Sequence, residues 1–121
     1  MRPNGGIGGR VTPEFVDRRH AEDARKAIHA PAVLRGLSQT FKMLGDESRL
    51  KICLALSRHE LCVGDLAGLV GLSESAVSHQ LRIMKAMRLV TYRKEGKMTF
   101  YMLDDEHIED LIRLGAKHVA E

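Results

Sequence analysis

Two short amphipathic segments joined by a tight turn constrain the fold of this chain more than any other feature. In the first segment, apolar side chains recur on one face of a helix: Leu61, Leu66, Leu69 and Val70. The sequence Gly71-Leu72-Ser73 then supplies a turn, and the serine that ends it is a preferred N-cap for a following helix. In the second segment, apolar residues recur at spacings of four and three: Val77, Leu81, Met84 and Met87. The two segments together predict a helix-turn-helix.

The second predicted helix has a polar and basic face opposite its apolar stripe. Its side chains are hydrogen-bond donors and cations, and we assign DNA contacts to six of them: Ser75, Ser78, His79, Gln80, Arg82 and Lys85. Such a face suits the major groove, where side chains read base edges and phosphates. An ordinary helical hairpin with a solvated outer face would show the same pattern, so the residues that follow must separate the two interpretations.

A β-hairpin is predicted directly after the second helix. Residues 89–93 and 98–103 have the composition of strands, and the turn between them contains Gly96. From residue 73 to residue 97 there are six basic residues against two acidic ones, an excess of four. Contact with phosphates explains this excess, and in the hairpin we assign it to Arg93, Lys94 and Lys97. The predicted fold class is therefore mainly α with a small β-hairpin wing, a winged helix-turn-helix that binds double-stranded operator DNA.

Three motifs of the chain are highly specific when taken together. They are residues 44–50 (LGDESRL), 60–67 (ELCVGDLA) and 73–82 (SESAVSHQLR). The motifs resemble the ArsR/SmtB family of metal-responsive winged-helix repressors, most closely its zinc-responsive members, and the resemblance spans residues 34–121. It implies a repressor, not an enzyme, that leaves its operator when metal binds.

Size and composition fit one small globular domain. The chain has 121 residues and a net charge of +3, with two cysteines, which are too few for a disulfide framework and favour a reducing cytoplasm. No apolar run approaches the roughly 20 residues of a membrane-spanning helix, and the first residues lack the apolar core of a signal peptide. We read residues 1–12 as a disordered glycine-rich arm and residues 13–121 as the DNA-binding and dimerisation domain.

Further helices are predicted on both sides of the helix-turn-helix. The first covers residues 13–30 with Thr12 as its N-cap, and the third is capped by Asp46 or Ser48. The last helix covers residues 104–120 and opens on acidic side chains, which suit the positive end of the helix dipole. Because the terminal helices have apolar sides and the operator is expected to be two-fold, we predict a homodimer that forms through them.

The last predicted helix carries four side chains of metal-binding types, Asp105 and His107 near its start and His118 and Glu121 at its end. His107 and His118 lie eleven residues apart. At about 1.5 Å per residue their Cα atoms are roughly 16 Å apart, so they cannot bind one ion within one helix. Two such helices packed antiparallel across a dimer axis would form two equivalent sites with four ligands each, and Asp104 could replace Asp105. Solvated charges at an exposed helix end would give the same spacing.

Two imidazoles and two carboxylates suit tetrahedral Zn(II), and Co(II) or Ni(II) would be accepted too. In the resembled family this pattern is a zinc-responsive site between the C-terminal helices, and every position of it is filled here. A small zinc hydrolase with His107, His118 and Glu121 as ligands is an alternative function. For such an enzyme the sequence supplies no general base, and a hydrolase would leave the helix-turn-helix unexplained.

Other sensor chemistries involve the cysteines. Cys62 and Asp65, with His20 as a further ligand, form an alternative site for a soft metal, and the C-terminal site would then be vestigial or structural. In some members of the resembled family such a pair binds metal together with cysteines of the N-terminal arm, but this arm has none. A thiol switch between Cys53 and Cys62 is a third mechanism, although Cys53 lies in an apolar run that predicts burial.

Overall fold

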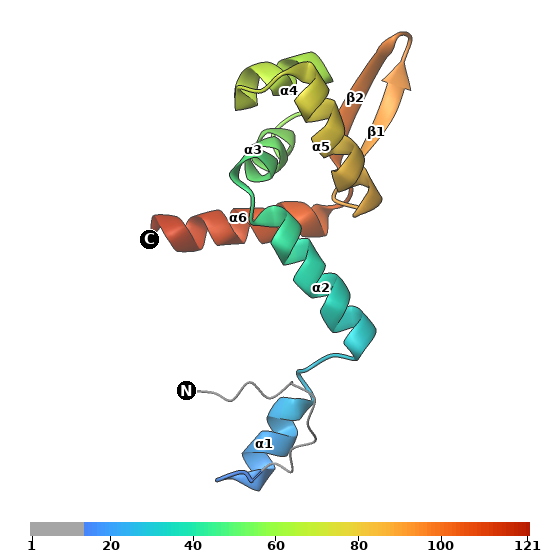
Figure 1. Ribbon diagram of the computed structural model, residues 1–121. Helices are drawn as coiled ribbons and strands as arrows, with labels where there is room; N and C mark the ends of the chain where they lie inside the picture. Colours follow the sequence, from blue (N-terminus) through green and yellow to red (C-terminus); the bar gives the residue numbers. More distant parts are fainter. Residues whose placement is uncertain (1–13) are drawn as a thin grey trace. The chain divides into compact units, whose positions relative to one another are not determined.

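The computed structural model describes residues 14–121, and the chain divides into two compact units, Met1–Arg35 and Gly36–Glu121. The elements are, in chain order, α1 (Arg18–Arg25), α2 (Pro31–Leu44), α3 (Glu47–Leu56), α4 (Val63–Val70), α5 (Glu74–Ala86), β1 (Val90–Glu95), β2 (Met98–Leu103) and α6 (Glu106–Ala120) (Figure 1). The predicted glycine-rich arm lies outside the described residues. Among residues 14–121, no helix is both long and apolar enough to cross a bilayer.

The first helix is shorter than predicted. It begins at Arg18 because Asp17 is its N-cap, with a carboxylate oxygen that accepts a hydrogen bond from the backbone N–H of His20 at 2.9 Å. It ends at Arg25, not at residue 30. The predicted N-cap, Thr12, lies outside the described residues. No side chain of α1 is buried, so local capping, without support from packing, fixes its length.

Capping also defines the start of α3. Gly45 follows the end of α2, and the Asp46 carboxylate accepts a hydrogen bond from the backbone N–H of Arg49 at 3.1 Å. Asp46 is therefore the N-cap, and Ser48, the alternative, lies inside the helix. The helix buries Ile52, Cys53 and Leu56, whereas Leu54 of the same apolar run is 44% exposed.

The predicted turn of the helix-turn-helix is confirmed. Gly71 adopts a φ of +74°, in the left-handed region that a side chain rarely enters, and so ends α4. Ser73 is the N-cap of α5, and its hydroxyl accepts a hydrogen bond from the backbone N–H of Ala76 at 3.1 Å. The chain therefore reverses within three residues and places α5 across α4.

The apolar stripes of the two helices are mostly as predicted. In α5, the side chains of Val77, Leu81 and Met84 have no exposed surface. In α4, the prediction is wrong at Leu69, which is 63% exposed, because Leu66, Ala67 and Val70 fill the inward face. Leu61 precedes α4 and forms a β-bridge instead of a helical turn.

The wing is an antiparallel hairpin of β1 and β2, paired from Val90 with Leu103 to Glu95 with Met98. Its turn contains Gly96 with a φ of +61°. Leu61 and Tyr101 exchange two backbone hydrogen bonds, of 3.1 and 2.8 Å, so the wing is tied to the segment before α4. These two hydrogen bonds connect the wing to the helix-turn-helix, in addition to the covalent link between α5 and β1.

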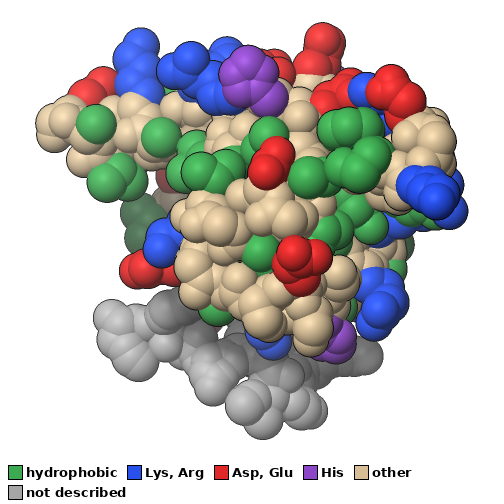
Figure 2. All heavy atoms as spheres, turned by 90° about the horizontal axis from the view of Figure 1, so that it is seen from above, with side chains coloured by type: hydrophobic (Ala, Val, Ile, Leu, Met, Phe, Trp, Pro, Cys, Tyr) green, Lys and Arg blue, Asp and Glu red, His purple; other side chains and the backbone are tan. Residues whose placement is uncertain are grey.

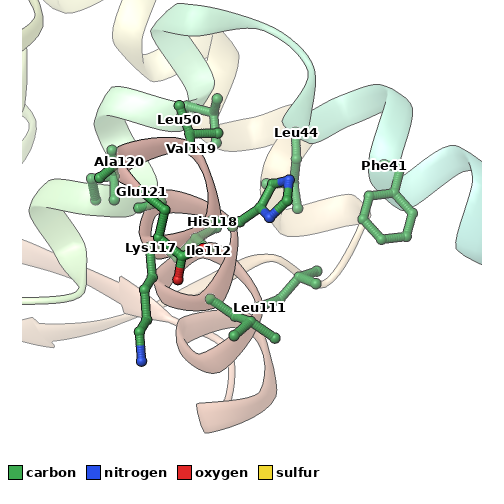
Figure 3. A pocket seen from close by; sticks show the side chains of 14 residues that line it. Phe41, Leu44, Leu50, Leu111, Ile112, Lys117, His118, Val119, Ala120 and Glu121 are labelled. Atoms are coloured by element: carbon green, nitrogen blue, oxygen red, sulfur yellow. The ribbon is translucent and has the colours of Figure 1, made fainter.

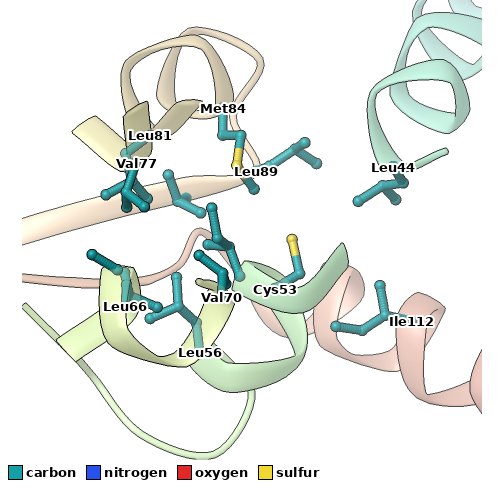
Figure 4. Close-up of a cluster of buried hydrophobic side chains, with 13 residues drawn as sticks. Leu44, Cys53, Leu56, Leu66, Val70, Val77, Leu81, Met84, Leu89 and Ile112 are labelled. Carbon is teal, nitrogen blue, oxygen red and sulfur yellow. The ribbon is translucent and has the colours of Figure 1, made fainter. Parts of the chain in front are cut away.

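One hydrophobic core holds the second unit together. Figure 4 shows side chains of α3, α4 and α5 pointing toward one another, with Ile112 of α6 at the edge of this cluster. The core consists of Leu44, Ile52, Cys53, Leu56, Leu66, Ala67, Val70, Val77, Leu81, Met84, Leu89, Val90 and Ile112. Among the described residues no polar or charged residue is fully buried, so each polar side chain of α5 keeps some exposed surface.

Candidate nucleic-acid interface and metal ligands

The predicted DNA-contact face of α5 lies at the surface. Ser75, His79, Arg82 and Lys85 are exposed, and Ser78 is half-buried. Because the opposite side of the helix is held in the core, these side chains can approach a DNA groove without any repacking of the domain. Figure 2 shows Lys and Arg side chains near the rim of the visible face, with hydrophobic side chains between them.

Gln80 differs from the other predicted contacts. It is half-buried, and its carboxamide oxygen accepts a hydrogen bond from Nε of Arg49 in α3 at 2.8 Å. This contact joins residues 31 positions apart, so no local spacing in the sequence predicts it. Arg49 is therefore a polar contact of α5 that the sequence analysis missed.

In the wing, Lys94, Lys97 and Arg93 are all exposed, but Arg93 also contacts other side chains of the protein. Arg93 Nε lies 2.7 Å from a carboxylate oxygen of Glu60, and its guanidinium carbon lies 4.9 Å from the centre of the Phe100 ring. The hydrogen bond with Glu60 raises the pKa of Arg93 above its usual range. The charge that we assigned to phosphate contact is thus paired with a carboxylate within the chain.

The contact face of α5 is continuous with the wing. Lys85 Nζ lies 5.4 Å from the centre of the Tyr92 ring in β1, within the range of a cation–π interaction. Tyr92 packs in turn against Tyr101 of β2, with ring centres 5.5 Å apart. Lys85 of the helix therefore lies next to the hairpin that carries the exposed Lys94 and Lys97, and such cations suit contact with phosphates.

The predicted metal ligands at the start of α6 lie next to each other. Asp105 is the N-cap, and its Oδ1 accepts hydrogen bonds from the backbone N–H groups of His107 at 2.9 Å and Ile108 at 3.1 Å. His107 Nδ1 lies 3.7 Å from the same oxygen, and its side chain is 86% exposed. The helix begins at Glu106 and not at Asp104 as predicted, because Asp105 is its N-cap, and the cap fixes this carboxylate beside the imidazole.

The other two predicted ligands, His118 and Glu121, lie at the end of α6 beside an apolar groove of about 1000 Å³. Figure 3 shows the imidazole of His118 projecting from the helix toward this groove. The larger apolar side chains that line the groove come from α2, α3 and α6: Phe41, Leu44, Leu50, Leu54, Leu111, Ile112, Leu114 and Val119. The C-terminal half of α6 therefore combines metal-binding side chains with an open hydrophobic surface.

No single chain brings the four C-terminal ligands together. Among residues 14–121, no three His, Cys, Asp or Glu side chains form a cluster that could hold a metal ion. Asp105 and His107 lie at one end of α6 and His118 and Glu121 at the other. A four-ligand site therefore requires a second chain.

The cysteine-based sites receive less support from the geometry. Cys62 is half-buried at the N-cap of α4, and its side chain makes no capping hydrogen bond. Asp65 lies in the first turn of the same helix. His20 belongs to the first unit, where its Nδ1 lies 2.8 Å from an Asp17 carboxylate oxygen. Burial raises the pKa of the Cys53 thiol to about 11, which disfavours the thiolate that a redox switch needs.

Comparison with known proteins identifies the family. The profile described as "Bacterial regulatory protein, arsR family" matches residues 46–92. A transcriptional repressor SmtB homolog from Synechocystis sp. is 49% identical over 85 residues, which cover 70% of this chain and 64% of that protein. A cadmium resistance regulatory protein, the CadC homolog of Staphylococcus aureus, is 42% identical over 86 residues, 70% of this chain and 71% of the relative.

Solved structures agree with the sequence relatives. HlyU from Vibrio cholerae superimposes with a TM-score of 0.70 at 29% identity, covering 76% of this chain and all of the other. The homodimeric winged helix-turn-helix DNA-binding domain of Mb0332 from Mycobacterium bovis gives a TM-score of 0.67 at 30% identity, with 79% and 84% coverage. The predicted fold is confirmed, and the relatives are transcriptional regulators, not enzymes. The chain belongs to the ArsR/SmtB family of winged helix-turn-helix DNA-binding regulators.

Proposed function

We propose that this chain is a homodimeric transcriptional repressor that binds a two-fold operator in the metal-free state and releases it when Zn(II) binds. The observation that carries this proposal is the position of the predicted ligands. His118 and Glu121 lie beside an open apolar groove at one end of α6, and Asp105 and His107 lie at the other end. A relative named as a cadmium resistance transcriptional regulatory protein favours a metal as the signal, and a relative named as a transcriptional repressor favours repression.

The groove favours a second copy of this chain as its occupant. Several of its apolar side chains are exposed in one chain, including Phe41 at 52%, Leu54 at 44% and Leu114 at 68%. Burying such surface is favourable by about 25 cal/mol per Å², and large exposed apolar patches mark association sites. An α6 helix from a partner, packed antiparallel to α6, would cover these side chains and bring opposite ends of the two helices together.

The types of the four ligands favour Zn(II) as the effector. Antiparallel packing places Asp105 and His107 of one chain beside the partner's His118 and the partner's Glu121. Two nitrogens and two carboxylate oxygens meet the preference of Zn(II) for four tetrahedral ligands, and the two negative charges balance the ion. Co(II) and Ni(II) accept the same donor types, so they are the competing effectors.

The test is a gel-shift series on a duplex that the wild-type protein selects from a random-sequence pool. We expect the metal-free protein to bind and Zn(II) to weaken binding by about 5- to 150-fold, the usual range of coupling between two sites. Co(II) and Ni(II) are tested in parallel. Tighter binding with Zn(II) would reverse the proposed sign, and an unchanged affinity with all three metals would assign regulation to another signal.

A control variant separates the two candidate sites. Cys62→Ser removes the soft ligand of the alternative site and leaves α6 intact. If the C-terminal site is the sensor, the zinc response of this variant should equal that of the wild type. Loss of the response would move the sensor to Cys62 and Asp65 and leave the C-terminal site a structural or vestigial role.

The wing offers a separate prediction about DNA contact. Lys97→Ala should weaken binding to all sequences and reduce the slope of log affinity against log salt by about 0.9, the contribution of one phosphate contact. Arg93→Ala is the matched variant. Because Glu60 already pairs with Arg93 at 2.7 Å, its removal should leave the slope nearly unchanged. Salt titrations by fluorescence anisotropy measure both slopes, and an equal decrease for the two variants would contradict the distinction.

A further inference from the structure

Arg49 connects three parts of the second unit. It lies in the first turn of α3, and its Nε donates a hydrogen bond to the side-chain oxygen of Gln80 in α5 at 2.8 Å. Its Nη1 lies 3.5 Å from the backbone oxygen of Met43, near the end of α2. Among residues 14–121, the bond to Gln80 is the one side-chain hydrogen bond that joins α5 to another helix.

The chemistry of this contact fixes the orientation of the amide. The guanidinium of arginine has donors and no acceptor, so the atom of Gln80 that faces it must be the carboxamide oxygen. Both side chains are half-buried, and a hydrogen bond from a charged donor is stronger than one between neutral groups. The oxygen of Gln80 is therefore held against the protein.

The position of Gln80 along α5 agrees with this orientation. It lies three residues after Val77 and four before Met84, and both of these side chains have no exposed surface. Residues three and four apart share one face of a helix. Gln80 thus lies on the side of α5 that packs against the domain, away from the exposed Arg82 and His79.

We propose that Arg49 is a positioning residue for DNA recognition, and that Gln80 is its anchor on α5 and not a base contact. By holding Gln80, Arg49 sets how α5 is rotated about its axis and so where the exposed side chains meet the groove. The proposal rests on the DNA-binding part of the proposed function. It replaces the DNA contact that we assigned to Gln80 from the sequence.

The test compares four variants: Arg49→Met, Gln80→Met, the double variant and Gln80→Glu. The readout is the ratio of affinity for the selected operator duplex to affinity for a scrambled duplex of equal length. Each single Met variant should lower this ratio by about tenfold, within the range of one good recognition contact. The double variant should be no worse than either single variant, because both changes break the same link.

Gln80→Glu distinguishes an anchor from a base contact. Glutamate keeps an oxygen acceptor for Arg49 but has no N–H₂ group to offer a base. An anchor predicts a ratio within about twofold of the wild type, since Arg49 also neutralises the new charge. Loss as large as in Gln80→Met, or independent additive losses from the two Met variants, would overturn the proposal. Arg49→Lys replaces Arg49→Met if the latter does not fold, and a wild-type protein that selects no operator would instead refute the proposed function.

Discussion

A heterodimer that combines two metal-binding-defective chains should recover one tightly bound Zn(II) ion. One chain carries Asp105→Ala and His107→Ala, and the other carries His118→Ala and Glu121→Ala. If each ion joins the start of one α6 to the end of the other, the heterodimer contains one complete site and one site with no ligand. Neither variant homodimer should bind tightly, because each retains only two ligands per site.

The measurement uses differently tagged chains, purified as heterodimers and titrated with Zn(II) against a chelator of known affinity. Wild type should bind two ions per dimer. His107→Ala alone should weaken both sites by more than about 100-fold, since even groups that only support a metal ligand contribute about 10- to 100-fold to affinity. His59→Ala is the matched control, because it removes another exposed histidine distant from α6 along the chain.

Two results would contradict ligand sharing. Properly formed heterodimers that fail to bind an ion would show that the four ligands do not meet across the dimer axis. Tight binding by either homodimer variant would place the site elsewhere in the chain. In both cases operator binding by the metal-free protein should persist, because the altered side chains lie outside α5 and the wing.

Arg82→Ala should weaken specific operator binding by about 5- to 150-fold, corresponding to about 1–3 kcal/mol for a lost base or phosphate contact. Arg82 is exposed on α5, on the side opposite the buried Leu81 and Met84. Its removal therefore costs no core packing, and zinc affinity and dimer formation should equal those of the wild type. Anisotropy titrations with the selected operator measure the effect.

Arg58→Ala provides the comparison for that variant. Arg58 is an exposed arginine between α3 and α4, where we assign no DNA contact, and its loss lowers the net charge by the same amount. A similar loss of affinity in both variants would indicate a general effect of charge. Unchanged affinity in Arg82→Ala would remove α5 from the role of recognition helix.

Features set by neighbouring residues were predictable from the sequence. Ser73 as a cap and Gly71 as a helix terminator depend on residues within one turn, and both predictions are confirmed. The start of α1 was wrong because two residues with capping side chains, Thr12 and Asp17, lie close together and local pattern does not choose between them. Leu61 was misplaced because its bridging partner is 40 residues away, in β2.

The polar contacts of the candidate interface illustrate the same limit. Arg93 reads as a free cation in sequence, but Glu60, 33 residues before it, pairs with it. Gln80 reads as a donor on a DNA-facing helix, but Arg49 holds its oxygen. In each case the sequence shows the type of side chain but not its partner within the protein, since that partner depends on packing between elements. The C-terminal ligands remain a prediction, because the proposed site needs two chains and the structure describes one.

Burial of Cys53 gives the domain a natural reporter of its own opening. The side chain has no exposed surface, and burial raises the pKa of the thiol to about 11. The thiolate is the nucleophile that attacks an alkylating reagent, so Cys53 reacts only in molecules in which the helices have separated. The half-buried Cys62 supplies an internal reference for reagent access. The labelling rate of Cys53 therefore measures the free energy of opening at the centre of the core, without any added probe. A slower rate in the presence of DNA or metal would show that this ligand makes opening less favourable.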